Sequence, residues 1–120
     1  MEKEITINGV VYTPKNKNVM ALNYVIIRAD RAGIFAGYLS KVIEKDNCQF
    51  KEVEICQCIR IWYWDGAASI SQLAIDGTSA PENCKFPEAT ATQTISGVIE
   101  IIPCTAKAMK SIQEVPIWKK

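Results

Sequence analysis

The sequence predicts an α+β fold: a mostly antiparallel β-sheet with two short helices and an N-terminal hairpin arm. Apolar residues alternate with polar ones along several segments, which is typical of half-buried strands. Helix signals, a capping residue in front and a glycine or proline behind, occur twice. The 120 residues, 48% of them hydrophobic, fit one soluble globular domain.

The N-terminal residues predict a small hairpin. Ile5, Ile7 and Val11 alternate around Asn8-Gly9, a dipeptide that strongly favours a two-residue hairpin turn. A polar loop follows from Pro14. We therefore expect residues 1–22 to form a hairpin arm and loop, which could pack on a partner subunit, and residues 23–120 to form a single β-rich ligand-binding domain.

Three strands are expected next. Residues 24–29 form the first, and the turn at 30–33 leads to a second over 34–44. The second strand is expected to place Ile34, Tyr38 and Val42 on one face and Phe35, Leu39 and Ile43 on the other. A turn at Asp46-Asn47 precedes a long third strand over residues 50–64.

The third strand shows clear period-two patterning. Its odd positions are mostly apolar, whereas its even positions change from acidic to basic to aromatic. This pattern predicts one core face and one face with another role. The odd positions are Val53, Ile55, Ile59, Ile61 and Tyr63.

The C-terminal half predicts two helices around one further strand. Ser69 is placed to cap a helix over 70–76 that ends at Gly77. A long loop over 78–93 leads to a strand over 94–102, which Pro103 is expected to stop.

Thr105 is placed to cap the second helix, in which Ala106, Met109 and Ile112 are spaced for one buried face. Pro116 ends this helix, and residues 117–118 are expected to anchor the tail to the body.

Composition excludes several classes of function. The chain has no histidine, which removes Ser-His-Asp and Cys-His nucleophiles and lowers the expectation of an enzyme. A net charge of +1 provides no long-range field to gather nucleic acid or an anionic membrane. No apolar run is long enough to span a bilayer, and the first residues lack a signal-peptide core, so we expect a cytoplasmic protein.

The five cysteines are expected to be reduced thiols. Their number is odd, and no secretion signal points to an oxidising compartment. Cys56 and Cys58 would share one strand face and, with Cys48, Cys84 or Cys104, could form a thiolate zinc site. Because C-x-x-C pairs are absent, buried free thiols are the favoured interpretation.

The segment from Arg60 to Ser69 is the densest candidate for a binding site. Trp62 and Trp64 would share a strand face with Arg60, offering stacking surfaces and a guanidinium matched to phosphate. The helix start after Asp65 would add backbone N–H groups. The alternative is that both indoles are core or subunit-interface residues and that Arg60 belongs to an ion pair.

Arg28 lies in the middle of an apolar strand, where it must meet an anion. Glu100, Glu54 and a ligand phosphate are the alternatives. In the loop 80–87, Phe86 could stack on a ligand or pin the loop to the core.

Four segments resemble a family of small phage and prophage proteins: YVIIRADRAGIFAGYL, RIWYWDGAASISQLAIDGT, NCKFP and VIEIIPCTAKAMKSIQEVPIWK. The resemblance covers about residues 23–119. This group is similar to the Thoeris anti-defence sponge proteins. The resemblance implies a symmetric homo-oligomer that sequesters a cyclic ADP-ribose isomer without cleaving it in the host bacterial cytoplasm. Some related sponges also hold cyclic oligonucleotides.

The resemblance also implies the site residues and their roles. It makes Arg28 and Arg60 phosphate contacts, and it implies neither a catalytic residue nor a metal or other cofactor. The remaining candidates are stacking residues, Trp62, Trp64 and Phe86, and polar readers, Asn83, Ser69 and Gln72. The alternative function is a phage module that binds a host or virion protein through its aromatic face.

Overall fold

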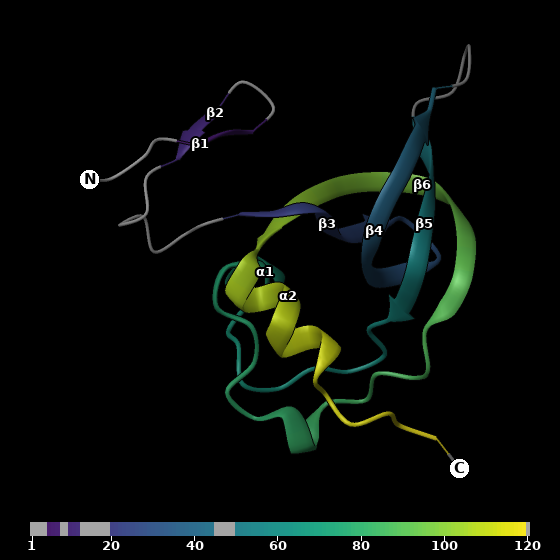
Figure 1. Cartoon of the computed structure of the whole chain (residues 1–120). Helices are drawn as coiled ribbons and strands as arrows, with labels where there is room; N and C mark the ends of the chain where they lie inside the picture. The colour runs from purple at the N-terminus through teal and green to yellow at the C-terminus, as the bar shows by residue number, and fades with distance from the viewer. Residues whose placement is uncertain (1–4, 8–9, 13–19, 45–49, 120) are drawn as a thin grey trace.

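The computed structural model describes residues 5–7, 10–12, 20–44 and 50–119. Figure 1 labels the elements along the chain. They are β1 (Ile5–Ile7), β2 (Val10–Tyr12), β3 (Met20–Ala29), β4 (Gly33–Ile43), β5 (Lys51–Arg60), α1 (Ile70–Asp76), the 3-10 turn η1 (Pro81–Asn83), β6 (Thr90–Thr105) and α2 (Ala106–Gln113).

Strands β3, β4, β5 and β6 form a closed antiparallel barrel in that order, because β6 pairs with both β5 and β3. The predicted α+β class, mostly sheet with two helices, is confirmed. The predicted N-terminal hairpin is present as a separate two-stranded sheet in which Ile5 pairs with Tyr12. Its Asn8-Gly9 turn and the predicted turn at Asp46-Asn47 lie outside the described residues.

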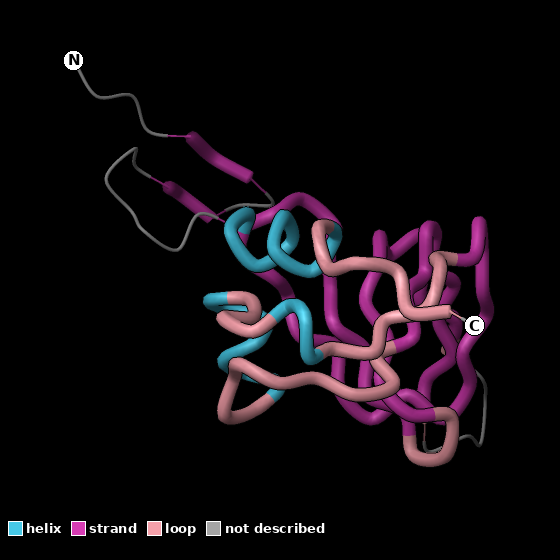
Figure 2. The backbone as a smooth tube through the Cα atoms, turned by 90° about the horizontal axis from the view of Figure 1, so that it is seen from below, coloured by secondary structure: helices cyan, strands magenta, loops and turns pink. Residues whose placement is uncertain are grey.

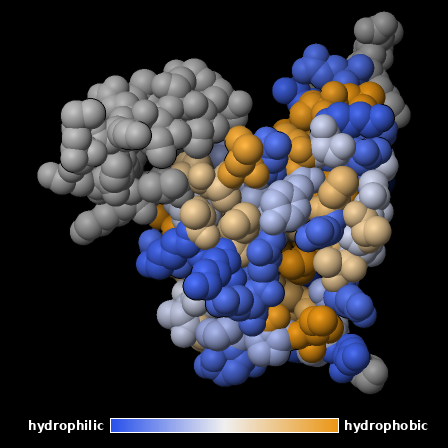
Figure 3. Space-filling view, in the orientation of Figure 1, coloured by the Kyte–Doolittle hydropathy of each residue, from blue (hydrophilic) through white to orange (hydrophobic). Residues whose placement is uncertain are grey.

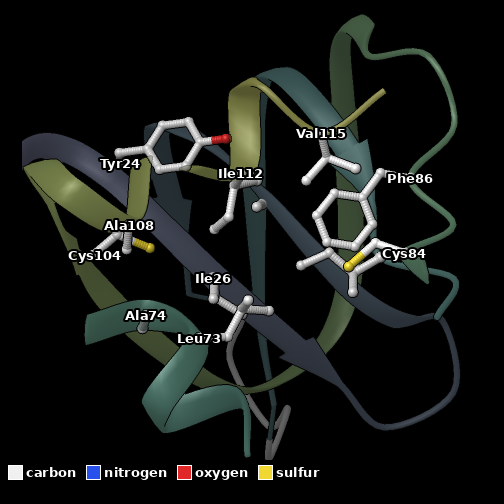
Figure 4. Packing of buried hydrophobic residues seen from close by; sticks show 12 residues of the cluster. Tyr24, Ile26, Leu73, Ala74, Cys84, Phe86, Cys104, Ala108, Ile112 and Val115 are labelled. Carbon is white, nitrogen blue, oxygen red and sulfur yellow. The ribbon is translucent and has the colours of Figure 1, made fainter. Parts of the chain in front are cut away.

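The barrel encloses one core and carries a second on its outer face. The barrel core contains inward side chains from all four strands: Val25, Ile27, Ala29, Phe35, Val53, Ile55, Cys58, Ile95 and Val98. The helix core packs residues of β3, β4 and β6 against the two helices and the segments outside the strands (Figure 4): Tyr24, Ile26, Ala36, Ile61, Leu73, Ala74, Cys84, Phe86, Cys104, Ala108, Ile112 and Val115.

Strand β3 contributes to both cores, since residues 24–27 are all buried. The predicted division of β4 is confirmed up to Leu39: Ile34 and Tyr38 pack against the helix core, and Phe35 and Leu39 against the barrel core. Beyond Leu39 the register with β5 shifts, and the prediction that Val42 shares the face of Ile34 and Tyr38 is wrong. Both helices lie to one side of the strands (Figure 2). On the face shown in Figure 3, hydrophilic residues gather over the helices, and a hydrophobic group lies on the projecting end of β4 and β5, where Val42 is 40% exposed.

The helix boundaries agree with the capping signals. The Ser69 hydroxyl accepts a hydrogen bond from the Gln72 amide, and α1 ends at Gly77 with φ +76°. Thr105 caps α2 as predicted. The predicted buried face of α2 is partly wrong: Ala106 is exposed, and the buried residues are Ala108 and Ile112.

The predicted end of β5 at Trp64 is wrong, because the strand stops at Arg60. The Ile61 amide still donates to the Ile34 carbonyl at 2.8 Å. The amides of Trp62 and Tyr63 instead donate to the Lys85 carbonyl, at 3.2 and 3.4 Å, so the chain leaves β4 and pairs with a loop.

Strand β6 is longer than the predicted 94–102. It begins at Thr90, which pairs with Cys58, and continues through Pro103 to Thr105. Proline lacks the ladder N–H and is tolerated where pairing is irregular. Here the register between β3 and β6 shifts beside the Val25–Pro103 pair.

The C-terminal tail is anchored through its backbone, as predicted. Ile117 forms a bridge with Phe86, and the Trp118 amide donates to the Phe86 carbonyl at 3.0 Å. Within the described part of the chain, neither helix has the length and hydropathy required to cross a membrane.

We predict that Thr105→Val destabilises the fold by about 2 kcal/mol. The Thr105 hydroxyl is buried, donates to the Ile75 carbonyl at 2.6 Å and accepts from the Ala108 amide at 3.0 Å. Valine keeps the shape but leaves both buried groups unpaired. Urea unfolding measures the loss; exposed Thr94→Val is the matched control, and equal effects of the two would contradict this role.

We also predict that stability falls at alkaline pH. Burial raises the pKa of the Cys58 thiol to about 11, against an opposing effect of Arg60, and that of the Cys104 thiol to about 12, from an ordinary value of 9.0. Around and above pH 9 the unfolded chain therefore loses protons that the folded chain keeps, and the free energy of unfolding decreases up to about pH 11 for Cys58 and about pH 12 for Cys104.

Chemical denaturation between pH 8 and 10.5 measures this slope. The double variant Cys58→Ala/Cys104→Ala should flatten it. An unchanged slope in that variant would show that these thiols are not the groups responsible.

Candidate functional site

A bulge in β5 decides where the following residues point. Gln57 has a left-handed backbone with φ +50°, and the register between β4 and β5 shifts there. A bulge adds one residue to a strand and so exchanges its two faces from that point on. Val53 and Ile55 accordingly lie in the barrel core, whereas Ile59 and Ile61 belong to the helix core.

The prediction that the odd positions of residues 50–64 form one continuous face is therefore wrong. The prediction that Cys56 and Cys58 share a face is wrong for the same reason: Cys58 is buried in the barrel core and Cys56 is only half-buried. Gly37 lies opposite the bulge. A β-carbon there would collide with the Ile55 side chain and the Cys56 carbonyl.

The bulge brings Arg60 to the end of the barrel, beside Phe35, with which it is paired across the strands. The Arg60 guanidinium carbon lies 4.6 Å from the centroid of the Phe35 ring. Its Nη1 donates to the Ala32 carbonyl at 3.0 Å. A guanidinium has five N–H donors, so others remain for a ligand.

Arg60 borders a cleft of about 580 Å³, which we call the barrel-mouth cleft. It is lined by the turn after β3, by Phe35, Phe50 and Arg60, and by residues 93–97 of β6. Ligand sites commonly have volumes of about 300–1,000 Å³. Two arginines, Arg31 and Arg60, and one carboxylate, Asp30, line the cleft, so its charged side chains sum to a positive charge.

Arg28 lies elsewhere, on the outer surface of the barrel. Its Nε is 3.0 Å from a Glu100 carboxylate oxygen, and the two residues are direct cross-strand neighbours. Both side chains are about half exposed. Of the alternatives that the sequence left open, the structure shows the ion pair with Glu100.

The two candidate indoles have different environments. Trp62 is 65% exposed, whereas Trp64 is half-buried against the helix core and donates from its indole nitrogen to the Ala67 carbonyl at 3.2 Å. Neither lines the barrel-mouth cleft. The expectation that both share a strand face with Arg60 is wrong, because β5 ends before them.

Ser69 and Gln72 cap α1 reciprocally. Ser69 accepts from the Gln72 amide at 3.1 Å, and the Gln72 side-chain oxygen accepts from the Ala68 amide at 2.7 Å. Asn83 donates to an Asp65 carboxylate oxygen at 3.0 Å. These three polar side chains thus make structural contacts.

Phe86 is 2% exposed and belongs to the helix core. The structure therefore shows the second of the two alternatives from the sequence, in which Phe86 pins its loop to the core. Of the eight predicted site residues, Arg60 alone lines the barrel-mouth cleft, and the structure does not gather the eight in one pocket.

Sequence reasoning missed Arg31 and Phe35, together with Gln93 and Ser96 of β6. Arg31 had a usable signal, since the chain contains only three arginines and this one lies in a turn. The alternation of β4 assigns Phe35 to a strand face, but nothing in the local sequence places an arginine over its ring.

A second exposed feature, the aromatic surface, consists of Trp62, Tyr63, Lys85, Ile117 and Trp118. The Lys85 amino group lies 6.0 Å from the Tyr63 ring centroid and 5.6 Å from that of Trp118. Backbone bridges join Tyr63 to Lys85 and Phe86 to Ile117, so three distant segments meet there. Trp62, Tyr63 and Ile117 are each more than half exposed, and Trp118 is 38% exposed.

A metal centre finds no support in the described part of the chain, where no three His, Cys, Asp or Glu side chains gather to hold an ion. Cys58 lies in the barrel core, whereas Cys84 and Cys104 lie in the helix core, and all three are free thiols. The alternative zinc site that joins Cys58 to Cys84 or Cys104 is therefore wrong, and the version with Cys48 lies outside the described residues.

Comparison with known proteins gives one match. The family model described as a domain of unknown function (DUF6948) matches residues 22–112, which is most of the chain. No curated protein and no solved structure matches. The matched region contains the whole barrel except for the first two residues of β3, and both helices except for the last residue of α2. The chain belongs to the family of this domain of unknown function, DUF6948.

Proposed function

We propose that the protein binds a small phosphorylated ligand of the nucleotide class in the barrel-mouth cleft and holds it without chemical change. The observation that carries this proposal is Arg60, whose guanidinium lies against the Phe35 ring at the edge of a 580 Å³ cleft. Among the described residues, no carboxylate forms an ion pair with it.

The lining chemistry suits such a ligand. The guanidinium groups of Arg31 and Arg60 match phosphate oxygens in geometry and charge. Phe50, which is partly exposed, presents apolar surface to a sugar or base, whereas Phe35 is buried and supports the Arg60 guanidinium from below. Gln93 and Ser96 supply neutral hydrogen-bonding groups.

The chain lacks histidine and keeps its barrel-core thiol in an unreactive form, and both facts favour binding without chemical turnover. The sequence contains no histidine. Cys58 lies in the barrel core and is the cysteine nearest in sequence to Arg60. Burial raises the pKa of its thiol to about 11, so the thiol is protonated at neutral pH. A protonated, buried thiol is a poor nucleophile.

The finer proposal rests on the resemblance to Thoeris anti-defence sponges. On that basis the ligand is a cyclic ADP-ribose isomer, the protein acts in the host bacterial cytoplasm, and the working form is a symmetric homo-oligomer. Two arginines in the lining of a cleft of about 580 Å³ support a ligand that contains a diphosphate.

A second candidate function is favoured by the aromatic surface. Trp62 and Tyr63 are 65% and 51% exposed, and aromatic residues are enriched in protein interfaces. In this alternative, the surface docks on a host or virion protein.

We predict that Arg60→Gln weakens binding of cyclic ADP-ribose by about tenfold or more, because it removes a charge-assisted hydrogen bond to phosphate. Isothermal titration calorimetry against cyclic ADP-ribose, its glycocyclic isomers and ADP-ribose measures the affinity. Lys41→Gln removes the same charge from an exposed residue beside Glu54 and should leave the affinity unchanged.

Mass spectrometry of the ligand released from the protein should show the mass of the unmodified nucleotide. Absence of binding heat at tens of micromolar protein for every one of these nucleotides would contradict the proposal. If binding instead requires a protein partner and is lost in Trp62→Ala, the second candidate function is the correct one.

A further inference from the structure

A separate groove lies on the outer face of the barrel, beside the C-terminal end of α2. It has a volume of about 340 Å³ and shares no lining residue with the barrel-mouth cleft. Two tyrosines and two glutamines provide its polar groups: Tyr24, Tyr38, Gln57 and Gln113. Ile59 and Ala89 complete the lining.

The Tyr24 hydroxyl is a buried polar group without a hydrogen-bond partner. Tyr24 is 1% exposed, and its hydroxyl points toward the last turns of α2 (Figure 4). Gln113 is the neighbouring hydrogen-bonding side chain and opposes the burial effect by lowering the pKa of this phenol, but its Nε2 donates to the Tyr38 hydroxyl at 3.0 Å. Buried hydroxyls in native proteins nearly always have a partner, so this one indicates a missing group.

Neighbouring groups hold the hydroxyl in place. The Tyr24 and Tyr38 rings meet edge to face with centroids 5.0 Å apart. The Tyr38 hydroxyl donates to the Met109 sulfur at 3.8 Å. Burial raises the pKa of Tyr24 above its ordinary value of 10.0, so the hydroxyl keeps its proton and remains a donor.

Unusual backbone conformations flank the same groove. Among the described residues, Asn23 and Gln57 are the two non-glycine residues with positive φ, at +62° and +50°. Asn23 directly precedes Tyr24, and Gln57 lines the groove. Such conformations cost free energy and concentrate at functional sites.

We propose that this groove binds a small uncharged molecule with an adjacent hydrogen-bond acceptor and donor, such as a primary carboxamide or the lactam edge of a heterocycle. The acceptor would accept a hydrogen bond from the Tyr24 hydroxyl, and the donor would reach the Gln57 side-chain oxygen. The described lining contains no charged side chain, which favours a neutral ligand over an ion.

Entry requires one movement. The Tyr24 hydroxyl has no solvent-accessible area, whereas Gln113 is exposed in the last turn of α2 and can turn outward. The ligand carboxamide then takes the place that the Gln113 side chain leaves. This site is independent of the function proposed for the barrel-mouth cleft.

Nicotinamide is the probe, and nicotinate, which has the same ring but a carboxylate, is the control ligand. In 15N–1H correlation spectra of the full chain, nicotinamide should shift the amides of Tyr38, Gln57 and Gln113 in a saturable manner. Tyr24→Phe, which deletes only the hydroxyl, should weaken binding at least fivefold. Tyr63→Phe, which deletes an exposed hydroxyl outside the groove, should leave it unchanged.

The melting temperature of Tyr24→Phe is the second readout and should not fall, because an unpartnered buried hydroxyl contributes no hydrogen bond. A fall would show that the hydroxyl is already satisfied in the free protein and would overturn the proposal. Three other results would also overturn the proposal. Nicotinamide could fail to shift the amides that line the groove, Tyr24→Phe could bind nicotinamide as tightly as the unaltered protein, or nicotinate could bind as tightly as nicotinamide. Arg60→Gln should not affect nicotinamide, so this result is separable from the test of the cleft.

Discussion

The bulge at Gln57 is the constraint on which both candidate sites depend. One extra residue in β5 exchanges the faces of the strand, so Arg60 follows Cys58 to the inner side and reaches the Phe35 ring. The same bulge places Gln57 itself in the groove beside Tyr24. It is possible because Gly37, on the neighbouring strand, has no side chain to meet the displaced backbone.

The rest of the fold supports this irregular strand from two sides. Strand β3 is buried on both faces and connects the barrel core to the helix core. Thr105 joins the end of α1 to the start of α2, so the helices cover the outer face as a unit. A strained residue persists only where its surroundings determine its position, and two cores on opposite sides of β5 provide that condition.

The sequence predicts the features that depend on local chemistry. Ser69, Gly77 and Thr105 define the helix ends because capping needs only neighbouring residues. The division of residues 34–39 of β4 between two faces follows from regular alternation, which ends where the register with β5 shifts after Leu39. The continuation of β6 through Pro103 was not predictable, since it depends on irregular pairing with β3.

The site was predicted less completely than the fold, for one physical reason. The bulge residue is a glutamine, which carries no signal for positive φ, and the glycine that permits it lies 20 positions earlier, on another strand (37 against 57). An unbroken alternation of the two strand faces places Arg60 on the same face as Trp62 and Trp64, which is what the sequence predicts. The structure instead groups it with Arg31 and Phe35.

The placement of Arg60 can be measured directly in the free protein by NMR. The account predicts nuclear Overhauser effects between the Phe35 ring and the Arg60 side chain, with Arg60 methylene protons shifted upfield by the ring. Overhauser effects from the Phe35 ring to the side chain of Ile59 instead, with Arg60 at ordinary shifts, would show a regular strand. That result would contradict the register change from which the cleft derives its charge.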